Sequence, residues 1–151
     1  MLDKNIFLFI SDQQRTDTMK CYGNDWIRSP HLDSGADQSY DFENTYVTEA
    51  VCTASRGSLM TGLYPHSHGC LVNNLLLEDH IRSIAEMLPD TYRKAHFGKW
   101  HLGNDAFRQH GFDEWISTED GSRPRYTLPD PPFSDYHQWL VEQGFEPEGR
   151  I

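Results

Sequence analysis

Residues 52–62 place a thiol, a hydroxyl and a guanidinium within five residues of one another, as Cys52, Ser55 and Arg56. The run ends at Gly62 and predicts a helix over 53–62. The first turn of a helix has unpaired N–H groups and a partial positive charge, which attract an anion and acidify a nearby thiol. Arg56 lies one turn after Cys52, and its fork of donors suits the oxygens of sulfate or phosphate. Taken alone, these residues equally fit a buried, inert Cys52 beside a surface Arg56.

A second pair of polar side chains, Lys99 and His101, follows the segment 92–98, which we predict to be a strand. If the chain stays extended beyond this strand, alternation places both side chains on one side. A cation and a proton donor side by side suit a transferring anion and its leaving group. Taken alone, the same spacing is more typical of a surface Lys99 and a packed His101.

A carboxylate, Asp12, follows the apolar run 5–11, which predicts a buried strand. Open α/β sheets bind ligands at the carboxyl ends of their strands, which favours Asp12 as a ligand. Its alternative role is a helix N-cap. His66 and His68 are spaced like a metal pair on an extended segment. Because no third ligand of metal type is near them, loop packing or a place at a substrate rim is favoured.

Together these segments resemble the sulfatase family. Residues 52–62 are similar to its signature, Cys-x-Pro/Ala-Ser-Arg followed by Leu/Met-Thr-Gly, with Ala54 in place of the commoner Pro. The run Gly-Lys-Trp-His-Leu-Gly over 98–103 is similar to the second signature, residue for residue. Asp-Gln-Gln-Arg-Thr-Asp over 12–17 resembles the segment after the family's first strand. Weaker matches extend the resemblance, in order, over most of 5–116.

For catalysis, the resemblance implies that Cys52 is converted after translation to formylglycine, whose hydrate is the nucleophile. Lys99 is then expected to contact the sulfate, and Arg56 and Lys99 to stabilise charge on the transferring group. His101 is expected to hydrogen-bond the formylglycine hydroxyl and to act as a base when sulfate is expelled. Cys52, Arg56, Lys99 and His101 are therefore the expected catalytic residues.

The resemblance also implies calcium as a cofactor. Asp12 is expected to be a ligand, with Gln13 beside it and Cys52 as a third ligand after its conversion. An amide oxygen can bind calcium, although Gln13 brings no negative charge to the site.

The expected fold class is α/β, as part of an alkaline-phosphatase-like parallel-sheet sandwich with helices on both faces. We interpret residues 1–151 as the amino-terminal part of a sulfatase catalytic domain, with the remainder of the domain absent. The polar, Pro-rich segment 117–135 is expected to be a surface loop or insertion. Strands are expected at 5–11, 41–46 and 92–98. Helices are expected near 30–38, 53–62, 80–88 and 135–143, with a short one before residue 20.

Composition limits the function classes. Hydrophobic residues at 37% and charged residues at 24% are typical of a globular protein. The net charge of −10 argues against nucleic acid and anionic membranes as partners. No stretch has the length of a membrane span and no signal peptide is visible, so we expect a cytoplasmic location. The odd count of three cysteines fits a reducing compartment, with Cys21 and Cys70 as small packing residues.

The expected function is hydrolysis of a sulfate ester, by a formylglycine nucleophile with calcium, on a carbohydrate or aryl substrate. The expected partners are a sulfated small molecule or glycan and a maturation enzyme, either formylglycine-generating or anaerobic. Two alternatives stay open. One is a phosphonate or phosphate ester hydrolase of the same superfamily, and the other is an inactive truncated fragment.

Overall fold

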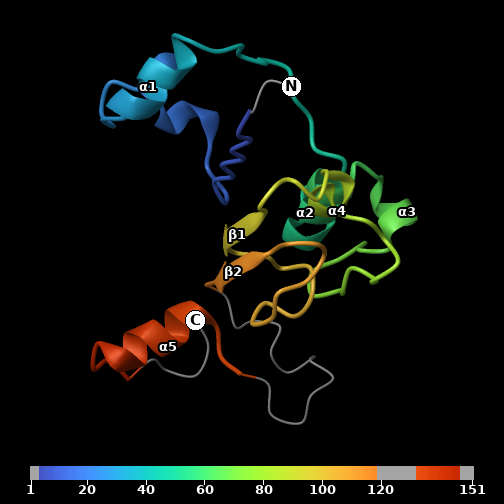
Figure 1. The fold of residues 1–151 in the computed structure, drawn as a ribbon. Coiled ribbons are helices and arrows are strands. Elements are labelled where there is room, and N and C mark those ends of the chain that lie inside the picture. The colour runs from blue at the N-terminus through green and yellow to red at the C-terminus, as the bar shows by residue number, and fades with distance from the viewer. Residues whose placement is uncertain (1–3, 119–131, 147–151) are drawn as a thin grey trace. The chain divides into compact units, whose positions relative to one another are not determined.

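A computed structural model of the chain describes residues 4–118 and 132–146. The chain folds into two compact units, Met1–Thr45 and Tyr46–Ile151. Figure 1 shows the first unit in blue to cyan, with short helices only, and the second unit with the remaining helices and both strands. Among the described residues, no helix is both long and apolar enough to cross a membrane.

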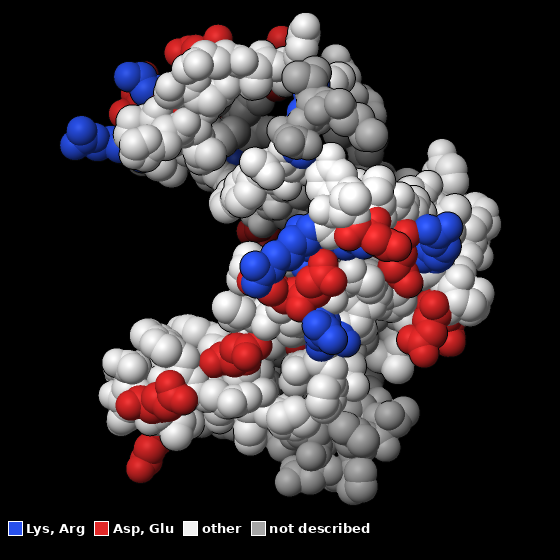
Figure 2. All heavy atoms as spheres, in the orientation of Figure 1, with Lys and Arg blue, Asp and Glu red and all other residues white. Residues whose placement is uncertain are grey.

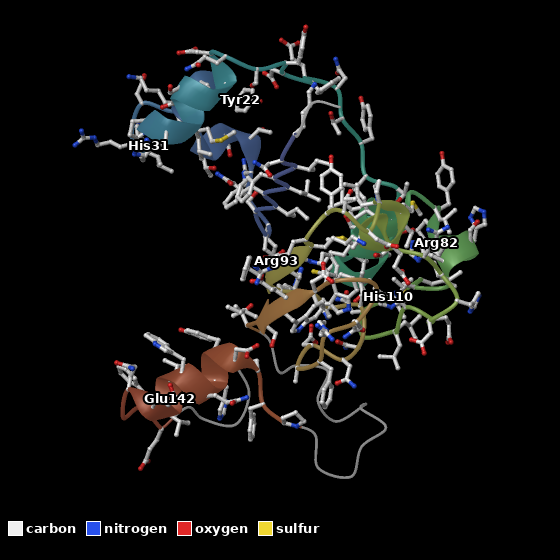
Figure 3. The ribbon with its side chains drawn as sticks, in the orientation of Figure 1. Tyr22, His31, Arg82, Arg93, His110 and Glu142 are labelled. Carbon is white, nitrogen blue, oxygen red and sulfur yellow. The ribbon has the colours of Figure 1, made fainter. Side chains whose placement is uncertain are left out.

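Side-chain hydrogen bonds connect the short helices of the first unit to one another and to the segment after them. These helices are η1 (Thr16–Thr18), η2 (Lys20–Tyr22) and α1 (Pro30–Ala36). Pro30 starts α1 at a position where its missing N–H costs nothing. Asp33 of α1 accepts the backbone N–H of Cys21 at 2.9 Å. Tyr22, labelled in Figure 3, donates its hydroxyl to Asp41 at 2.6 Å. The expected helix near 30–38 is confirmed, but Cys21 is exposed, so its expected packing role is wrong.

The strands expected at 5–11 and 41–46 are absent from the structure of the described residues. The apolar run is exposed rather than buried, with Phe7 87% and Phe9 70% exposed. A strand needs a neighbour to pair its backbone N–H and C=O groups, and the described part of this unit contains no second strand. The apolar pattern predicted a strand at 5–11, but this segment has no strand to pair with among the described residues of the first unit.

The second unit is α/β, and its described residues form one parallel pair of strands. Strand β1 (Ala95–Gly98) pairs with β2 (Glu114–Ser117), with Ala95 opposite Glu114 and Gly98 opposite Ser117. Around them lie α2 (Cys52–Thr61), α3 (Pro65–His68), α4 (Ile84–Met87) and α5 (Asp135–Glu142). Arg93, labelled in Figure 3, pairs with Glu114 beside the start of the two strands. The α/β class predicted from the sequence is confirmed.

Most expected elements of this unit are confirmed, with changed bounds. The strand at 92–98 is shortened to β1, and the helix at 80–88 is shortened to α4, which Ser83 and Glu86 begin as a capping box. Helix α5 matches the expected 135–143, and Ser134 caps it by accepting the His137 N–H at 3.2 Å. Strand β2 and helix α3 were not predicted. Of the expected loop at 117–135, residues 119–131 lie outside the described residues.

The core of the second unit is an aromatic cluster around Trp100. Trp100 is 1% exposed, and its ring centroid lies 5.3 Å from that of Trp115, 5.4 Å from that of His96 and 5.9 Å from that of Phe112. The Trp115 indole N–H donates to the backbone oxygen of Asp105 at 2.7 Å, which satisfies its polar end. The cluster thus packs the residues after β1 against β2. On the face of this unit shown in Figure 2, basic and acidic side chains are interspersed.

Candidate functional site

Cys52 is the first residue of α2 and is half-buried. Val51 before it is extended and offers no side-chain cap, so the helix start has to find its hydrogen-bond acceptors elsewhere. Asn73 supplies one of them, since its amide oxygen accepts the Thr53 N–H at 3.1 Å. The predicted helix is confirmed, starting at Cys52 instead of after it. Cys70, by contrast, is fully buried, and burial raises the pKa of its thiol to about 11.

Asn73 and Asn74 both bond to Thr53 at the start of α2, and Asn74 connects it to His101; sequence reasoning missed both asparagines. The Asn74 N–H donates to the Thr53 hydroxyl at 3.1 Å, and the Asn74 amide oxygen lies 3.1 Å from Nε2 of His101. Asn74 has φ +64, a left-handed conformation that asparagine tolerates better than most residues. The signal in the sequence was the Asn-Asn pair, whose side chains commonly bond to nearby backbone.

His101 is buried and is not extended. Its φ is +57, so the chain turns after β1 and the alternation expected for Lys99 and His101 does not apply. Asp105, which is 0% exposed, accepts the His101 backbone N–H at 2.8 Å and so supports this turn. The interpretation of His101 as packed and the interpretation of it as a site residue both agree with this burial.

Arg56 is buried, which excludes the alternative of a surface arginine. Its Nη1 donates to the backbone oxygen of Lys99 at 2.7 Å. This bond joins α2 to the segment after β1, and Lys99 itself is half-buried. The Arg56 guanidinium and the backbone of Lys99 are therefore neighbours. Together with the Asn74 link, this bond connects Lys99 and His101 to the helix that contains Cys52 and Arg56.

His66 and His68 do not form a metal pair, because they lie in the short helix α3 and differ in environment. His66 is exposed and stacks on Tyr64, whereas His68 is 1% exposed. Among the described residues there is no group of three or more His, Cys, Asp or Glu side chains that could hold a metal. The favoured packing role is confirmed for His68, but the expected extended segment is wrong.

His68 holds a hydrogen-bonded chain with a fixed direction. Its Nδ1 accepts the Cys70 N–H at 3.1 Å, so the proton of the neutral ring is on Nε2, which donates to the Ser58 hydroxyl at 3.2 Å. Burial lowers the pKa of His68, which keeps the ring neutral. A histidine that donates to a serine cannot take its proton, so Ser58 is not an activated nucleophile. Thr48 donates to the same hydroxyl at 2.7 Å.

Asp12 and Gln13 lie in the first unit, are exposed, and precede η1. Arg15, not Asp12, occupies the N-cap position of that helix, so the capping alternative for Asp12 is wrong. Carboxylate and amide oxygens are ligands that calcium accepts, but calcium takes about six to eight of them. The described residues of this chain therefore do not complete a calcium site.

Comparison with known proteins places these residues in a family. The family model described as Sulfatase matches residues 4–141. An N-acetylglucosamine-6-O-sulfatase of Bacteroides thetaiotaomicron is 30% identical over 93% of this chain and 25% of its own. An ulvan-active sulfatase of Formosa agariphila is 35% identical over 76% of this chain and 24% of its own. The chain thus spans about a quarter of the length of these relatives.

A solved structure agrees with the sequence matches. It is a protein in complex with its substrate, D-glucosamine-2-N,6-O-disulfate, and it matches 70% of this chain and 21% of its own with a TM-score of 0.61 and 31% identity. This likeness covers an alkaline-phosphatase-like fold, which confirms the expected fold class. The chain belongs to the sulfatase family.

Proposed function

We propose that this chain carries the nucleophile of an enzyme that hydrolyses sulfate esters, with Cys52 as the nucleophile's precursor. One observation carries the proposal: two hydrogen-bonded links join α2, which Cys52 begins, to the segment that holds Lys99 and His101. The first is the 2.7 Å bond from Arg56 to the Lys99 carbonyl. The second runs from Thr53 through Asn74 to His101. Family membership supports the reaction class.

The role of Cys52 depends on its conversion. Formylglycine at this position supplies, as its hydrate, an oxygen nucleophile and a second hydroxyl through which sulfate can be released. The start of α2 favours the negative charge that develops nearby, because its N–H dipoles point toward that end. The conversion requires a maturation enzyme, either formylglycine-generating or anaerobic, which is part of the proposal.

Arg56 and Lys99 are proposed to stabilise charge, and His101 to transfer a proton. Arg56 and Lys99 supply two cations from adjacent segments. We assign to them the stabilisation of the negative charge on the transferring sulfate group. His101 is buried and fixed by bonds to Asn74 and Asp105, as a general acid–base must be to meet a proton in a defined direction. We assign to His101 the transfer of the proton of the nucleophile's hydroxyl.

Calcium is the cofactor we propose for the same reaction, with Asp12 and Gln13 as two of its ligands. When bound, a metal polarises the sulfate oxygens and lowers the pKa of an oxygen it holds. The test is titration calorimetry with calcium on the protein and its Asp12→Asn variant, with Asp17→Asn as a matched control. Weaker binding in Asp12→Asn alone supports the assignment. Equal binding in both variants contradicts it.

A sulfated carbohydrate is the substrate class we propose. The Bacteroides relative is named for a sulfated amino sugar, and the solved structure contains a disulfated glucosamine as its substrate. A small sulfated sugar, or a glycan that carries one, is therefore the first substrate to test.

The reaction class is tested by comparing hydrolysis of an aryl sulfate with that of an aryl phosphodiester. Faster sulfate hydrolysis supports the proposal, and faster phosphodiester hydrolysis favours the phosphonate or phosphate ester hydrolase. The intact mass of the protein from its native host reports on Cys52 in parallel. A loss of mass that fits conversion of a thiol to an aldehyde is expected for the protein and its Cys21→Ser variant, and not for Cys52→Ser. An unconverted Cys52 in the native protein contradicts the proposed nucleophile.

A further inference from the structure

The ring of His101 is held by an amide that is itself fixed to α2. Nε2 of His101 lies 3.1 Å from the amide oxygen of Asn74. An amide oxygen only accepts hydrogen bonds, so Nε2 carries the proton in this contact. The neutral ring is therefore the Nε2–H tautomer, and its basic lone pair is on Nδ1. Which nitrogen is basic decides the direction in which a histidine can take a proton.

The backbone of Asn74 is fixed to α2. Its backbone N–H donates to the hydroxyl of Thr53 at 3.1 Å, and Thr53 is 0% exposed. The neighbouring Asn73 accepts the Thr53 N–H at 3.1 Å, so the two asparagines bind the same residue in the first turn of α2. The left-handed backbone at Asn74, with φ +64, directs its N–H and side chain from this one position.

The backbone of His101 is fixed independently of its ring. Asp105 accepts the His101 N–H at 2.8 Å, and the backbone oxygen of Asp105 accepts the indole N–H of Trp115 at 2.7 Å. The main chain of His101 is thus supported by the aromatic core, whereas its ring is bonded to Asn74. Removing the Asn74 amide leaves the backbone support in place, so the two effects can be separated by experiment.

We propose that Asn74 is a positioning residue that sets the tautomer and orientation of His101 relative to the first turn of α2, which Cys52 begins. The proposal rests on the proposed function, in which His101 moves the proton of the nucleophile. Asn74 holds Nε2 of His101 as a donor, and its own N–H is bonded to Thr53, the residue that follows Cys52. The ring of His101 is thereby fixed relative to the start of α2 through Thr53 and Asn74.

Three variants of the full-length protein test this role. Asn74→Gly keeps the left-handed backbone and the N–H bonded to Thr53, but it removes the amide oxygen. Asn74→Asp keeps an acceptor oxygen at the same position. Asn73→Gly is the matched control, because it removes the bond to the Thr53 N–H and leaves the Asn74 amide in place.

The first readout is the tautomer of His101, measured by long-range proton–nitrogen NMR on protein with labelled histidine, and assigned by the signal lost in His101→Gln. We expect the Nε2–H form in the natural protein, in Asn74→Asp and in Asn73→Gly. In Asn74→Gly we expect a mixture of tautomers. A single, unchanged Nε2–H signal in Asn74→Gly would overturn the proposal, because another group would then set the tautomer.

The second readout is the kinetics of aryl sulfate hydrolysis. Loss of a residue that orients a catalytic group lowers activity by roughly 10–100-fold. We expect such a fall in kcat with KM nearly unchanged in Asn74→Gly, and a kcat closer to the natural value in Asn74→Asp. Equal losses in kcat for Asn74→Gly and Asn74→Asp would contradict the role of the acceptor oxygen. A natural protein with no sulfatase activity would overturn the proposed function, and the tautomer measurement would still decide the role of Asn74.

Discussion

Nη1 of Arg56 donates a 2.7 Å hydrogen bond to the backbone oxygen of Lys99, forty-three residues later in the chain. The bond joins the two segments that carry the family's signatures, and it does so through a buried side chain. Arg56 therefore has a structural role besides any contact with an anion. A variant at this position is expected to change both the stability of the second unit and the chemistry of the site.

Replacing Arg56 by methionine tests this double role. Arg56→Met keeps an unbranched side chain and removes the donor to the Lys99 oxygen. Loss of one partner of a buried hydrogen bond costs about 1–3 kcal/mol in the free energy of unfolding. Loss of a charge-stabilising donor costs about 10²–10³ in kcat. Urea unfolding and aryl sulfate hydrolysis measure the two effects.

Arg28→Met is the control for this variant, since Arg28 is exposed and lies in the first unit. It is expected to change neither quantity by much, because exposed substitutions away from special features have small effects. An unfolding midpoint that stays the same in Arg56→Met would show that the bond to Lys99 does not stabilise the unit.

Gly57 is required by the position of His68. A Cβ atom at Gly57 would lie 2.5 Å from Cε1 of His68 and 2.9 Å from its Nδ1. Gly57→Ala therefore forces α2 and α3 apart, which is expected to lower the free energy of unfolding by about 1–3 kcal/mol. Thermal unfolding measures the change. Gly35→Ala is the matched control in α1, where a Cβ meets nothing within 4 Å, and a helical alanine there is expected to stabilise by about 0.5–1 kcal/mol.

The buried thiol of Cys70 is expected to lower the free energy of unfolding in alkaline solution. Burial raises the pKa of its thiol from 9.0 to about 11, so the folded protein keeps a proton that the unfolded chain loses first. The stability contributed by the neutral thiol is complete below pH 9 and is lost as the pH rises toward 11. Urea unfolding between these pH values is expected to show the loss, and Cys70→Ala is expected to show a smaller one. An equal slope in both proteins would assign the loss to other groups.

The buried ring of His96 is expected to lower the free energy of unfolding in acid solution. Burial lowers the pKa of its ring below the ordinary 6.5, and nearby Arg56 lowers it further, against the bond to the Gly98 oxygen, which raises it. The unfolded chain therefore binds a proton at a higher pH than the folded one. The stability contributed by neutral His96 is present above pH 6.5 and is lost as the pH falls below it.

The measurement is the free energy of unfolding from pH 7.5 down to about 5, the range over which a histidine titrates. His96→Gln is expected to flatten the curve. His66→Gln is its control, because His66 is exposed and lies in α3, away from the aromatic cluster. Parallel curves for His96→Gln and the natural protein would contradict the role of His96.

The elements predicted well from the sequence are those whose causes are local. Helix α2 ends at Gly62, which is left-handed with φ +72, and α5 begins at Ser134, whose side chain caps it. Glycine stops and serine caps act within a few residues, so the sequence shows them directly. Cys52, Arg56, Lys99 and His101 became candidates because the two short segments that contain them resemble the family's signatures.

The elements predicted poorly depend on partners far along the chain. The apolar run 5–11 has a strand pattern, but whether it forms a strand depends on a neighbour to pair with. Strand β2 exists because it pairs with β1, and Ser117 at its end donates its N–H to Asp135 at 2.8 Å. Asn74 is similar, since its role is visible only when His101 lies beside it. Single-sequence patterns do not contain these distances.

The place of Trp100 between Lys99 and His101 makes the aromatic core a determinant of precision at the site. Its ring is enclosed by His96, Phe112 and Trp115, so the main chain on either side of it has little room to shift. The packed indole of Trp100 therefore fixes the backbone positions of both Lys99 and His101. Loosening the packing around Trp100 would displace both polar residues at once, so activity and packing in this unit are expected to be lost over the same temperature range.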